Sequence, residues 1–428
     1  MSPLPPPSIY AKDAAWPGFG EPPAGDQQVD IAVVGGGFTG ISTALNLAEK
    51  GFSVHLYEAE RIGYGASGRN GGQVVQGWTT DFSKLAARTP PETHRMVWDI
   101  GVMGKEIILE RCRKHGIDAD LRFGYLYAAL HGRHMRELEA MKAEWEEWGY
   151  GELEMMPDRA ALAPHINTDV YVGGLIDHAS GHLQPLKYLY GLATAARDAG
   201  VVIHENTPIR QVEPGVGGAN RLIHDHGTVT ALKLVLAGNA YLDRRAPKPM
   251  RQRLAPVTSA IIATEPLGDN VIRDLLPGRI AVADCNTALN YYRFDARGRM
   301  LFGGRASYTA QDFGIRRDLV KRMKAVFPTL ADAPIEHDWS GRIGITVDRI
   351  PHFGKIGENC WFVQGFSGHG VALTGVAGLI LAEAVAGDQG RFDVLASIRH
   401  MPFPGGIFRT PALALGMAFY KLRDQLKL

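Results

Sequence analysis

The sequence contains little of what several classes of protein need. Its three cysteines, Cys112, Cys285 and Cys360, form no CxxC pair, so neither a disulfide framework nor a cysteine zinc site is expected. No apolar run reaches the length of about 18 residues that marks a membrane span. The proline-rich opening lacks the apolar core of a secretory signal. We therefore expect a cytoplasmic protein with no bound metal.

An excess of charge is also missing. The chain has 46 basic and 45 acidic residues, a formal net charge of +1, and no long run of one sign. Because a nucleic-acid-binding protein needs clustered basic residues to contact phosphates, nucleic acid is not an expected partner. The hydrophobic share of 45% is that of an ordinary globular protein, and 428 residues imply more than one domain.

Glycine, by contrast, is concentrated in a few short segments. The first lies between the apolar strand-like run "VDIAVV" and "FTGISTALNLAEKG", which has helical spacing. A second strand, "FSVHLYEAE", completes a βαβ unit around Gly35-x-Gly37-x-x-Gly40. Such glycines admit a pyrophosphate to the helix N-terminus, and Glu58 can bind ribose hydroxyls. The unit predicts a dinucleotide site; a tight glycine turn is the alternative, and the motif alone fits NAD or FAD.

The second glycine segment favours FAD. "GYGASGRNGGQVVQG" (residues 63–77) follows the second strand and has neither a helical nor a strand period. Ordering glycine is entropically costly, so this abundance indicates that the backbone must approach something closely. Free N–H groups together with Arg69, Asn70 and Gln73 suit the phosphates, ribitol and ring edges of a flavin. A flexible surface linker is the alternative.

A third segment points the same way. "GFSGHGVALTG" follows the apolar strand "WFVQGF" and opens a helix rich in small residues. A helix N-terminus presents donors that suit the electron-rich N1–C2=O edge of a reduced flavin. His369 lies at this helix start and is a candidate catalytic residue; an ordinary interior histidine is the alternative.

Together these segments resemble the D-amino-acid-oxidase-like FAD-dependent oxidoreductases, and within them the gamma-glutamylputrescine oxidase branch. The resemblance spans nearly the whole chain through "GYGASGRNGGQ", "NYYRFD…RMLFGGR", "GITVDRIPHFG" and "GFSGHGVALTG". The FAD-binding residues that the resemblance and the motifs imply are Gly35, Gly36, Gly37, Phe38, Thr39, Gly40, Glu58, Ala59, Gly65, Ala66, Ser67, Arg69, Asn70, Gly71, Gly72, Gln73, Ile209, Ala237, Gly238, Asn239, Gly368, His369, Gly370 and Val371.

The reaction that the resemblance implies is amine oxidation. A hydride leaves the α C–H of the amine for flavin N5, and the imine hydrolyses to an aldehyde or keto acid. The expected partners are a small amine and an electron acceptor, either O₂, which gives H₂O₂, or another acceptor. Oligomeric state stays open.

The substrate pocket is expected on the strand "NYYRFD". Side chains alternate along a strand, so Tyr291 and Arg293 share one face and Tyr292 takes the other. Tyr292 and Arg293 are catalytic candidates, and Tyr291, Arg293 and Arg342 are substrate-binding candidates, because arginine pairs well with a carboxylate. His352 is a weaker candidate, and sheet packing is the alternative role for the strand residues.

The sequence departs from some relatives. Where these place a flavin-tethering cysteine or histidine, it has "SGRIGITVD" and Arg69, so FAD is expected to be non-covalent. A lysine that promotes oxygen reduction has no counterpart in "GRMLFGG", which leaves the acceptor open. An NAD(P)H-dependent flavin reductase or monooxygenase is one alternative, although no second nucleotide motif is found. A non-catalytic flavin-binding protein is another.

The expected fold is α/β with an α+β insertion, a Rossmann-like FAD-binding domain joined to a substrate domain with an antiparallel sheet. The C-terminal segment is expected to pack on the protein, with membrane contact as an alternative because one side is apolar and its end basic. The expected parts are an N-terminal extended arm (1–28), the FAD-binding domain (29–105, 170–250 and 336–395), the substrate domain (106–169 and 251–335) and a C-terminal tail or helix (396–428).

Overall fold

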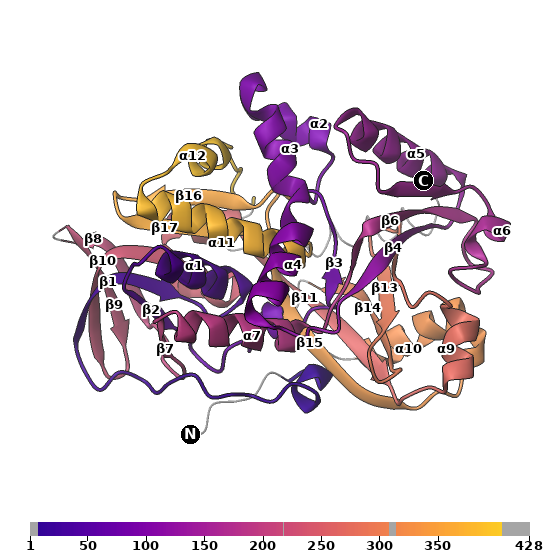
Figure 1. Ribbon diagram of the computed structural model, residues 1–428, viewed down its shortest axis with the longest axis horizontal. Helices are drawn as coiled ribbons and strands as arrows, with labels where there is room; N and C mark the ends of the chain where they lie inside the picture. The colour runs from indigo at the N-terminus through magenta and orange to yellow at the C-terminus, as the bar shows by residue number, and fades with distance from the viewer. Residues whose placement is uncertain (1–6, 217, 308–313, 405–428) are drawn as a thin grey trace.

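The computed structural model describes residues 7–404 except 217 and 308–313. Within these residues two β-sheets lie side by side, one with eight strands and one with nine (Figure 1). The first is mainly parallel and the second mainly antiparallel. The predicted fold class, an α/β unit joined to an antiparallel-sheet unit, is confirmed.

The first sheet is built around the predicted βαβ unit. Its central strand β1 pairs in parallel with β2 and β10, and β10 pairs in parallel with β17. The carboxyl ends of these strands therefore share one edge of the sheet. The order across the sheet is β16 (His352–Ile356), β17 (Cys360–Gln364), β10 (Gly227–Leu236), β1 (Gln27–Val34), β2 (Val54–Tyr57) and β7 (Val202–His204), with β9 (Ala219–His224) paired to β10 and β8 (Gln211–Val216) to β9.

Helices cover one face of this sheet. Ile31 and Val33 of β1 point into the core beneath them, while Ala32 and Val34 belong to the core on the opposite face. Burial on both faces explains why β1 is apolar throughout its second half. The covering helices are α1 (Phe38–Glu49), α7 (Pro185–Asp198) and α11 (Gly370–Ala386).

The second sheet carries a separate core. Helices α9 (Asp269–Leu275) and α10 (Ile315–Val326) contribute to it on one face. The strand order is β15 (Ile335–Ile345), β11 (Ala255–Thr264), β14 (Met300–Ser307), β13 (Asn290–Phe294), β12 (Ala281–Asp284), β4 (Arg122–Ala129), β6 (Gly173–His182) and β3 (Gln73–Val74), with β5 (Leu153–Met156) paired to β6. The remaining α-helices are α2 (Phe82–Ala86), α3 (His94–Val102), α4 (Gly104–His115), α5 (Gly132–Glu147), α6 (Arg159–Leu162), α8 (Lys248–Arg253) and α12 (Gly390–Ala396).

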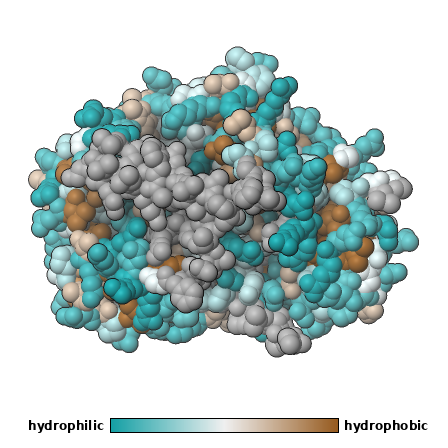
Figure 2. Space-filling model, turned by 180° about the vertical axis from the view of Figure 1, so that it is seen from behind, coloured by the Kyte–Doolittle hydropathy of each residue, from teal (hydrophilic) through white to brown (hydrophobic). Residues whose placement is uncertain are grey.

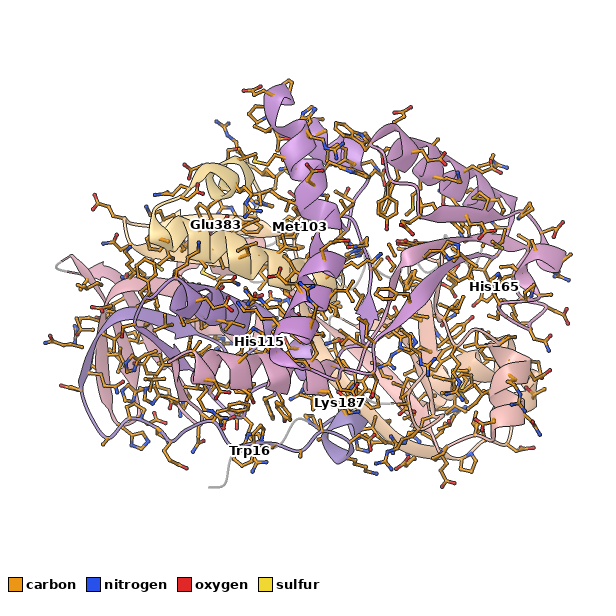
Figure 3. The ribbon with its side chains drawn as sticks, in the orientation of Figure 1. Trp16, Met103, His115, His165, Lys187 and Glu383 are labelled. Atoms are coloured by element: carbon orange, nitrogen blue, oxygen red, sulfur yellow. The ribbon has the colours of Figure 1, made fainter. Side chains whose placement is uncertain are left out.

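Helices α3 and α4 follow one another along the chain and meet at Met103, beside α11 (Figure 3). A Cβ added at Gly104 would lie 2.7 Å from that of Ala372, so close packing on α11 selects glycine there. Thr89 precedes α3 but does not cap it, because its hydroxyl donates to the Ala86 carbonyl. Gly116 ends α4 in the left-handed conformation that favours glycine.

The N-terminal segment is less extended than expected. Residues Ile9–Lys12 form a 3₁₀ turn in which Ile9 and Tyr10 are buried. The Ser8 hydroxyl donates to the Gly68 carbonyl (2.6 Å), and the Tyr10 hydroxyl donates to that of Asn70 (2.9 Å). This segment therefore supports the second glycine segment from behind.

Strand membership differs from the proposed domain limits at three places. Strands β3, β6 and β15 belong to the second sheet, although they lie wholly or mostly in the ranges proposed for the FAD-binding domain. The chain passes from one sheet to the other near these strands, so the sequence pattern alone does not locate the domain limits. Helix α12 ends at Ala396, where the predicted C-terminal segment begins, and the part of that segment beyond residue 404 lies outside the described residues.

No single helix in the described part of the chain is long and apolar enough to cross a membrane; α11 and α12 pass such a test only as a pair bent by 113°. Most of the residues of α11 are buried inside the protein. In the rear view the described surface is mostly hydrophilic, with scattered hydrophobic residues (Figure 2).

Helix α11 packs closely on α1 through glycine. A Cβ at Gly378 would lie 2.5 Å from the Cβ of Ser42 and 2.9 Å from the backbone nitrogen of Thr43. At Gly375, on the same helix, the nearest atom would be a methyl carbon of Ile107 at 3.4 Å. The first position has no room for a side chain, whereas the second has.

We expect Gly378→Ala to lower the free energy of unfolding by about 1–3 kcal/mol, because the helices must separate to admit the methyl group. Gly375→Ala is the matched control, and its higher helix propensity should leave stability unchanged or slightly raised. Urea unfolding of both variants measures this, and equal midpoints for the two would contradict the packing argument.

Candidate active site

Two cavities with a common wall lie at the carboxyl edge of the first sheet, where open α/β sheets bind their ligands. The larger has a volume of about 660 Å³ and the smaller about 390 Å³. The larger one is lined by segments that follow β1, β10 and β17, and the smaller one reaches to the second sheet. The residues common to both linings are Ala66, Asn70, Ile343, Ser367, Gly368 and Val371.

The first glycine motif brings the start of α1 against β1. A Cβ at Gly40 would lie 1.9 Å from the Gly35 carbonyl oxygen, and Gly35 itself has φ +113°. Only glycine allows this approach. Gly37 and Phe38 consequently present the helix N-terminus to the larger cavity, and the Phe38 N–H donates to the Ser67 hydroxyl (3.0 Å). The arrangement suits a pyrophosphate.

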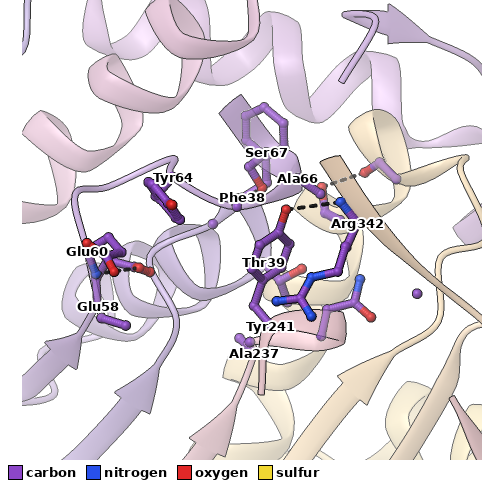
Figure 4. Close-up of a pocket in the computed structure, with 18 of the residues that line it drawn as sticks. Phe38, Thr39, Glu58, Glu60, Tyr64, Ala66, Ser67, Ala237, Tyr241 and Arg342 are labelled. Atoms are coloured by element: carbon purple, nitrogen blue, oxygen red, sulfur yellow. Dashed lines mark hydrogen bonds between the residues drawn. The ribbon is translucent and has the colours of Figure 1, made fainter. Parts of the chain in front are cut away.

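Glu58 follows β2 and lines the same cavity. Its carboxylate accepts hydrogen bonds from the backbone N–H groups of Gly36 (2.6 Å) and Glu60 (3.1 Å). Burial raises its pKa, and these two donors oppose that rise. Figure 4 shows Glu58 and Glu60 on one side of the cavity and Tyr241 with Arg342 on the other. A carboxylate fixed in this way is suited to accept hydrogen bonds from ribose hydroxyls.

The second glycine segment is held largely by its own side chains. Asn70 donates to the carbonyls of Ala66 (3.1 Å) and Ser67 (2.8 Å), and its oxygen accepts from Gly72 N–H (2.8 Å). Gly72 has φ +74°, and an added Cβ would meet the Leu183 carbonyl at 2.2 Å. The segment therefore faces the cavities mainly with backbone, while the Asn70 amide braces the turn.

Arg69 is also engaged by the protein. Its guanidinium donates to the carbonyls of Tyr64 (2.6 Å) and Ser340 (3.2 Å) and lies over the Tyr64 ring. Gln73 lines the smaller cavity and donates to the Val282 carbonyl (3.1 Å). These contacts connect the glycine segment to β15 and β12 of the second sheet.

The third glycine segment forms the wall between the cavities. Ser367 and Gly368 have φ values of +52° and +92°, so the chain turns sharply before α11 begins at Gly370. His369 lines the smaller cavity, where its Nε2 lies 3.2 Å from the Gln76 carbonyl oxygen and therefore carries the proton. Burial lowers the pKa of His369, so its ring is neutral at pH 7.

Tyr291 and Tyr292 point to opposite faces, as alternation requires. Tyr291 lines the smaller cavity, with its hydroxyl 3.2 Å from that of Ser259. Tyr292 instead donates to the Tyr171 hydroxyl (2.9 Å) and stacks on Phe302 in the core beneath α10. The prediction of Tyr292 as a catalytic residue does not fit, because the packed core takes its side of the strand.

Arg293 and Arg342 also lie away from the smaller cavity. Arg293 is buried and donates to the carbonyls of Gly71 (2.6 Å) and Leu183 (3.0 Å), so it holds the glycine segment rather than substrate. The Arg342 guanidinium lies 5.0 Å from the centre of the Tyr241 ring, within the larger cavity (Figure 4). Neither fits the predicted substrate-binding role.

The predicted FAD-binding residues fall into three groups. Those lining the larger cavity are Gly37, Phe38, Thr39, Glu58, Ala59, Gly65, Ala66, Ser67, Asn70, Ala237, Gly238, Asn239, Gly368, Gly370 and Val371. Those lining only the smaller are Arg69, Gly71, Gln73 and His369. Those lying behind the walls are Gly35, Gly36, Gly40, Gly72 and Ile209, and the weaker candidate His352 is buried beside Gln364.

Several lining residues were missed by sequence reasoning. Arg349 lies within "GITVDRIPHFG", which carries the family resemblance, and Tyr241 closely follows Asn239, a predicted FAD-binding residue, so their positions were a usable signal. Tyr125 and Ser259 come from strands of the second sheet, where nothing in the sequence distinguishes a cavity side chain from a packed one.

The residues present fit FAD. The joined cavities offer a glycine cradle at a helix N-terminus and a carboxylate beside it. The wall between them is a second helix N-terminus. These are the features that pyrophosphate, ribose and the pyrimidine edge of a flavin require.

Glu58→Ala should weaken FAD binding by about 10- to 100-fold, the effect of losing hydrogen bonds to a charged group. The dissociation constant is measured by titrating FAD into apoprotein and following flavin fluorescence. Glu92→Ala removes an exposed glutamate and is the control. Unchanged affinity in Glu58→Ala would show that this carboxylate does not hold the ribose.

Known proteins agree with the geometry. The chain is 40% identical over 399 residues to gamma-glutamylputrescine oxidoreductase of Escherichia coli (strain K12), covering 93% of each. Among solved structures, L-proline dehydrogenase from P. horikoshii superimposes with a TM-score of 0.73 at 18% identity, over 86% of this chain and 96% of that one. Glycine oxidase from Geobacillus kaustophilus gives 0.72 at 21%, over 87% and 99%. The model of the family described as "FAD dependent oxidoreductase" matches residues 30–384, and the chain belongs to this family of FAD-dependent oxidoreductases.

Proposed function

We propose that this protein oxidises a primary or secondary amine of the gamma-glutamylputrescine type with FAD. The observation that carries the proposal is the smaller cavity, which opens onto the glycine segment and the start of α11. The gamma-glutamyl amine is suggested by the name of the Escherichia coli relative. Bound flavin would accept, at N5, the hydride released from the carbon that bears the amine.

The protein would contribute position and electrostatics. Backbone of the glycine segment and Tyr291 confine the substrate from one side, and Gly368 and Val371 confine it where the cavities meet. The N-terminus of α11 supplies a positive dipole where negative charge would develop. His369, neutral and donating to the Gln76 carbonyl, fixes the backbone around that point. The imine product then hydrolyses to an aldehyde.

No dedicated base is needed. The titratable side chains that line the smaller cavity are Arg69, Tyr125, Tyr291, Arg349 and His369. Burial raises the pKa of Tyr291 to about 12 and raises that of Tyr125 further. Burial lowers the pKa of His369. Among these groups none is placed to take a proton in the weakly alkaline range, so the substrate would enter as the neutral amine.

Non-covalent attachment of FAD also belongs to this proposal. Cys112, Cys285 and Cys360 contribute to neither cavity lining. No lysine lines either cavity in the part of the chain that the structure describes, so the acceptor could be O₂ or a carrier. Acid precipitation tests the attachment, because it should leave all of the flavin in the supernatant.

The decisive experiment is anaerobic mixing of the holoenzyme with a panel of amines and, separately, with NADPH. Bleaching of the flavin absorbance by an amine is expected, and admission of air followed by a peroxide assay then identifies the acceptor. Bleaching by NADPH alone would instead indicate a flavin reductase or monooxygenase. If nothing in the panel bleaches the flavin, a binding role replaces catalysis.

The pH dependence of kcat/KM should be set by the pKa of the substrate amine rather than by a titrating group of the protein. A substrate amine with a pKa near that of lysine, about 10.4, is mostly protonated at neutral pH, so kcat/KM should rise about tenfold per pH unit below that value. A substrate with a less basic amine should shift the midpoint downward by the difference between the two pKa values. A midpoint that stays fixed for both substrates would reveal a protein base.

A further inference from the structure

One turn beside the smaller cavity holds an arginine in a backbone conformation that favours glycine. Arg349 has φ +65°, and apart from glycine this region is populated mainly by asparagine and aspartate. The Thr346 hydroxyl donates to the Ile350 carbonyl (2.8 Å), and Ile350 N–H donates to the Asp348 carboxylate (3.2 Å). A strained backbone conformation persists only where the surrounding structure holds it, and such conformations are frequent at functional sites.

The turn is also anchored from outside. Arg88 pairs with the Asp348 carboxylate at 2.5 Å, and His400 lies 3.1 Å from it. Although burial opposes ionisation, hydrogen bonds from His400 and Arg88 hold the pKa of Asp348 well below its usual range. Asp348 is therefore fully engaged as an anion by these groups. The neighbouring arginine is thus presented on a rigid support.

The Arg349 guanidinium has no hydrogen bond or ion pair with any residue that the structure describes. Its side chain lines the smaller cavity and is exposed, as is Leu289 (38% exposed). By contrast Val75, Tyr125 and Val371, from the same lining, are buried. Arg349 thus lies at the mouth, and these buried residues form the floor, of which Val371 also lines the larger cavity.

The charged side chains that line the smaller cavity in the described residues are all positive. Its lining contains Arg69 and Arg349 but no aspartate or glutamate in the described residues. Arg69 is already bonded to backbone carbonyls, so Arg349 is the cation available to a ligand. Val257, Ile343 and Ile345 pack together and form an apolar part of the wall. A chain of methylene groups fits such a wall.

We propose that Arg349 binds a carboxylate at the far end of the substrate while the reacting carbon lies at the floor. The enzyme therefore selects amines whose carboxylate is separated from the oxidised carbon by a chain that spans the cavity. Glycine and N-methylglycine, whose carboxylate is attached to that carbon, cannot reach both places. A bare diamine offers Arg349 only a second positive charge. The assignment rests on the proposed function and names a substrate-specificity residue for it.

Two substrates with the same reacting amine test the proposal: gamma-glutamylputrescine, which has a carboxylate, and N-acetylputrescine, which has none. Arg349→Gly should raise KM for the first about 10- to 100-fold, the loss expected for hydrogen bonds between charged groups, with kcat unchanged. For N-acetylputrescine KM should equal that of the wild type. Arg349→Lys should recover only part of the difference, because lysine lacks the bidentate fork.

A binding measurement without turnover provides a second readout. Gamma-glutamylbutylamine, which has no free terminal amine, should perturb the flavin absorbance of the wild type and bind Arg349→Gly about 10- to 100-fold more weakly. Glycine accepts the left-handed backbone, so this variant should melt no lower than the wild type. Val347→Ala, an exposed position of the same turn that lines neither cavity, is the matched control and should behave as wild type.

The outcomes separate the two proposals. A wild type whose flavin no amine bleaches refutes amine oxidation and this assignment with it. A wild type that oxidises gamma-glutamylputrescine, beside an Arg349→Gly variant with the same KM and the same affinity for gamma-glutamylbutylamine, refutes the assignment alone.

Discussion

The contact between Gly40 and the Gly35 carbonyl is the constraint on which the site depends. Because a Cβ there would lie 1.9 Å from that oxygen, only glycine lets α1 begin so close to β1. The start of α1 then reaches Ser67, whose hydroxyl accepts from Phe38 N–H and so fixes the second glycine segment relative to the helix. That segment in turn is held by Arg293 from the second sheet. One close backbone approach thus determines where both cavities lie.

The parts of the site that the sequence predicts depend on residues close together in the chain, and the parts that it does not predict depend on contacts with distant residues. The glycine motif and Glu58 are readable because strand, turn, helix and acid follow within one short βαβ unit. Asn70 was expected to bind a cofactor, yet a short polar side chain can bond its own turn, and here it does. Arg349 lies in a segment that carries the family resemblance, but the sequence does not predict its left-handed conformation, which is supported by the contact of Asp348 with distant Arg88.

The strand Asn290–Phe294 illustrates the same limit. Alternation correctly places Tyr291 and Tyr292 on opposite faces, but the period does not say which face borders the cavity. That choice is made by α10 and Phe327, which pack on Tyr292 and leave Tyr291 to line the cavity. Arg293 lies on the same face of the strand as Tyr291, but its guanidinium donates to the carbonyls of Gly71 and Leu183 instead of lining the cavity. The fold class can be predicted without knowing which face of a strand borders the cavity, whereas the catalytic residues cannot.

A polar chain connects the second sheet to the start of α11. His369 donates to the Gln76 carbonyl, Gln76 N–H donates to the Ser180 hydroxyl (2.9 Å), and Ser180 donates to buried Asp177. Tyr150 and two backbone N–H groups complete the shell of Asp177. Because backbone acceptors surround the Nε2–H group of His369, the imidazole keeps this tautomer. His369 therefore contributes no charge to the smaller cavity, and among the described lining residues the one charge without a protein partner is that of Arg349 at the mouth.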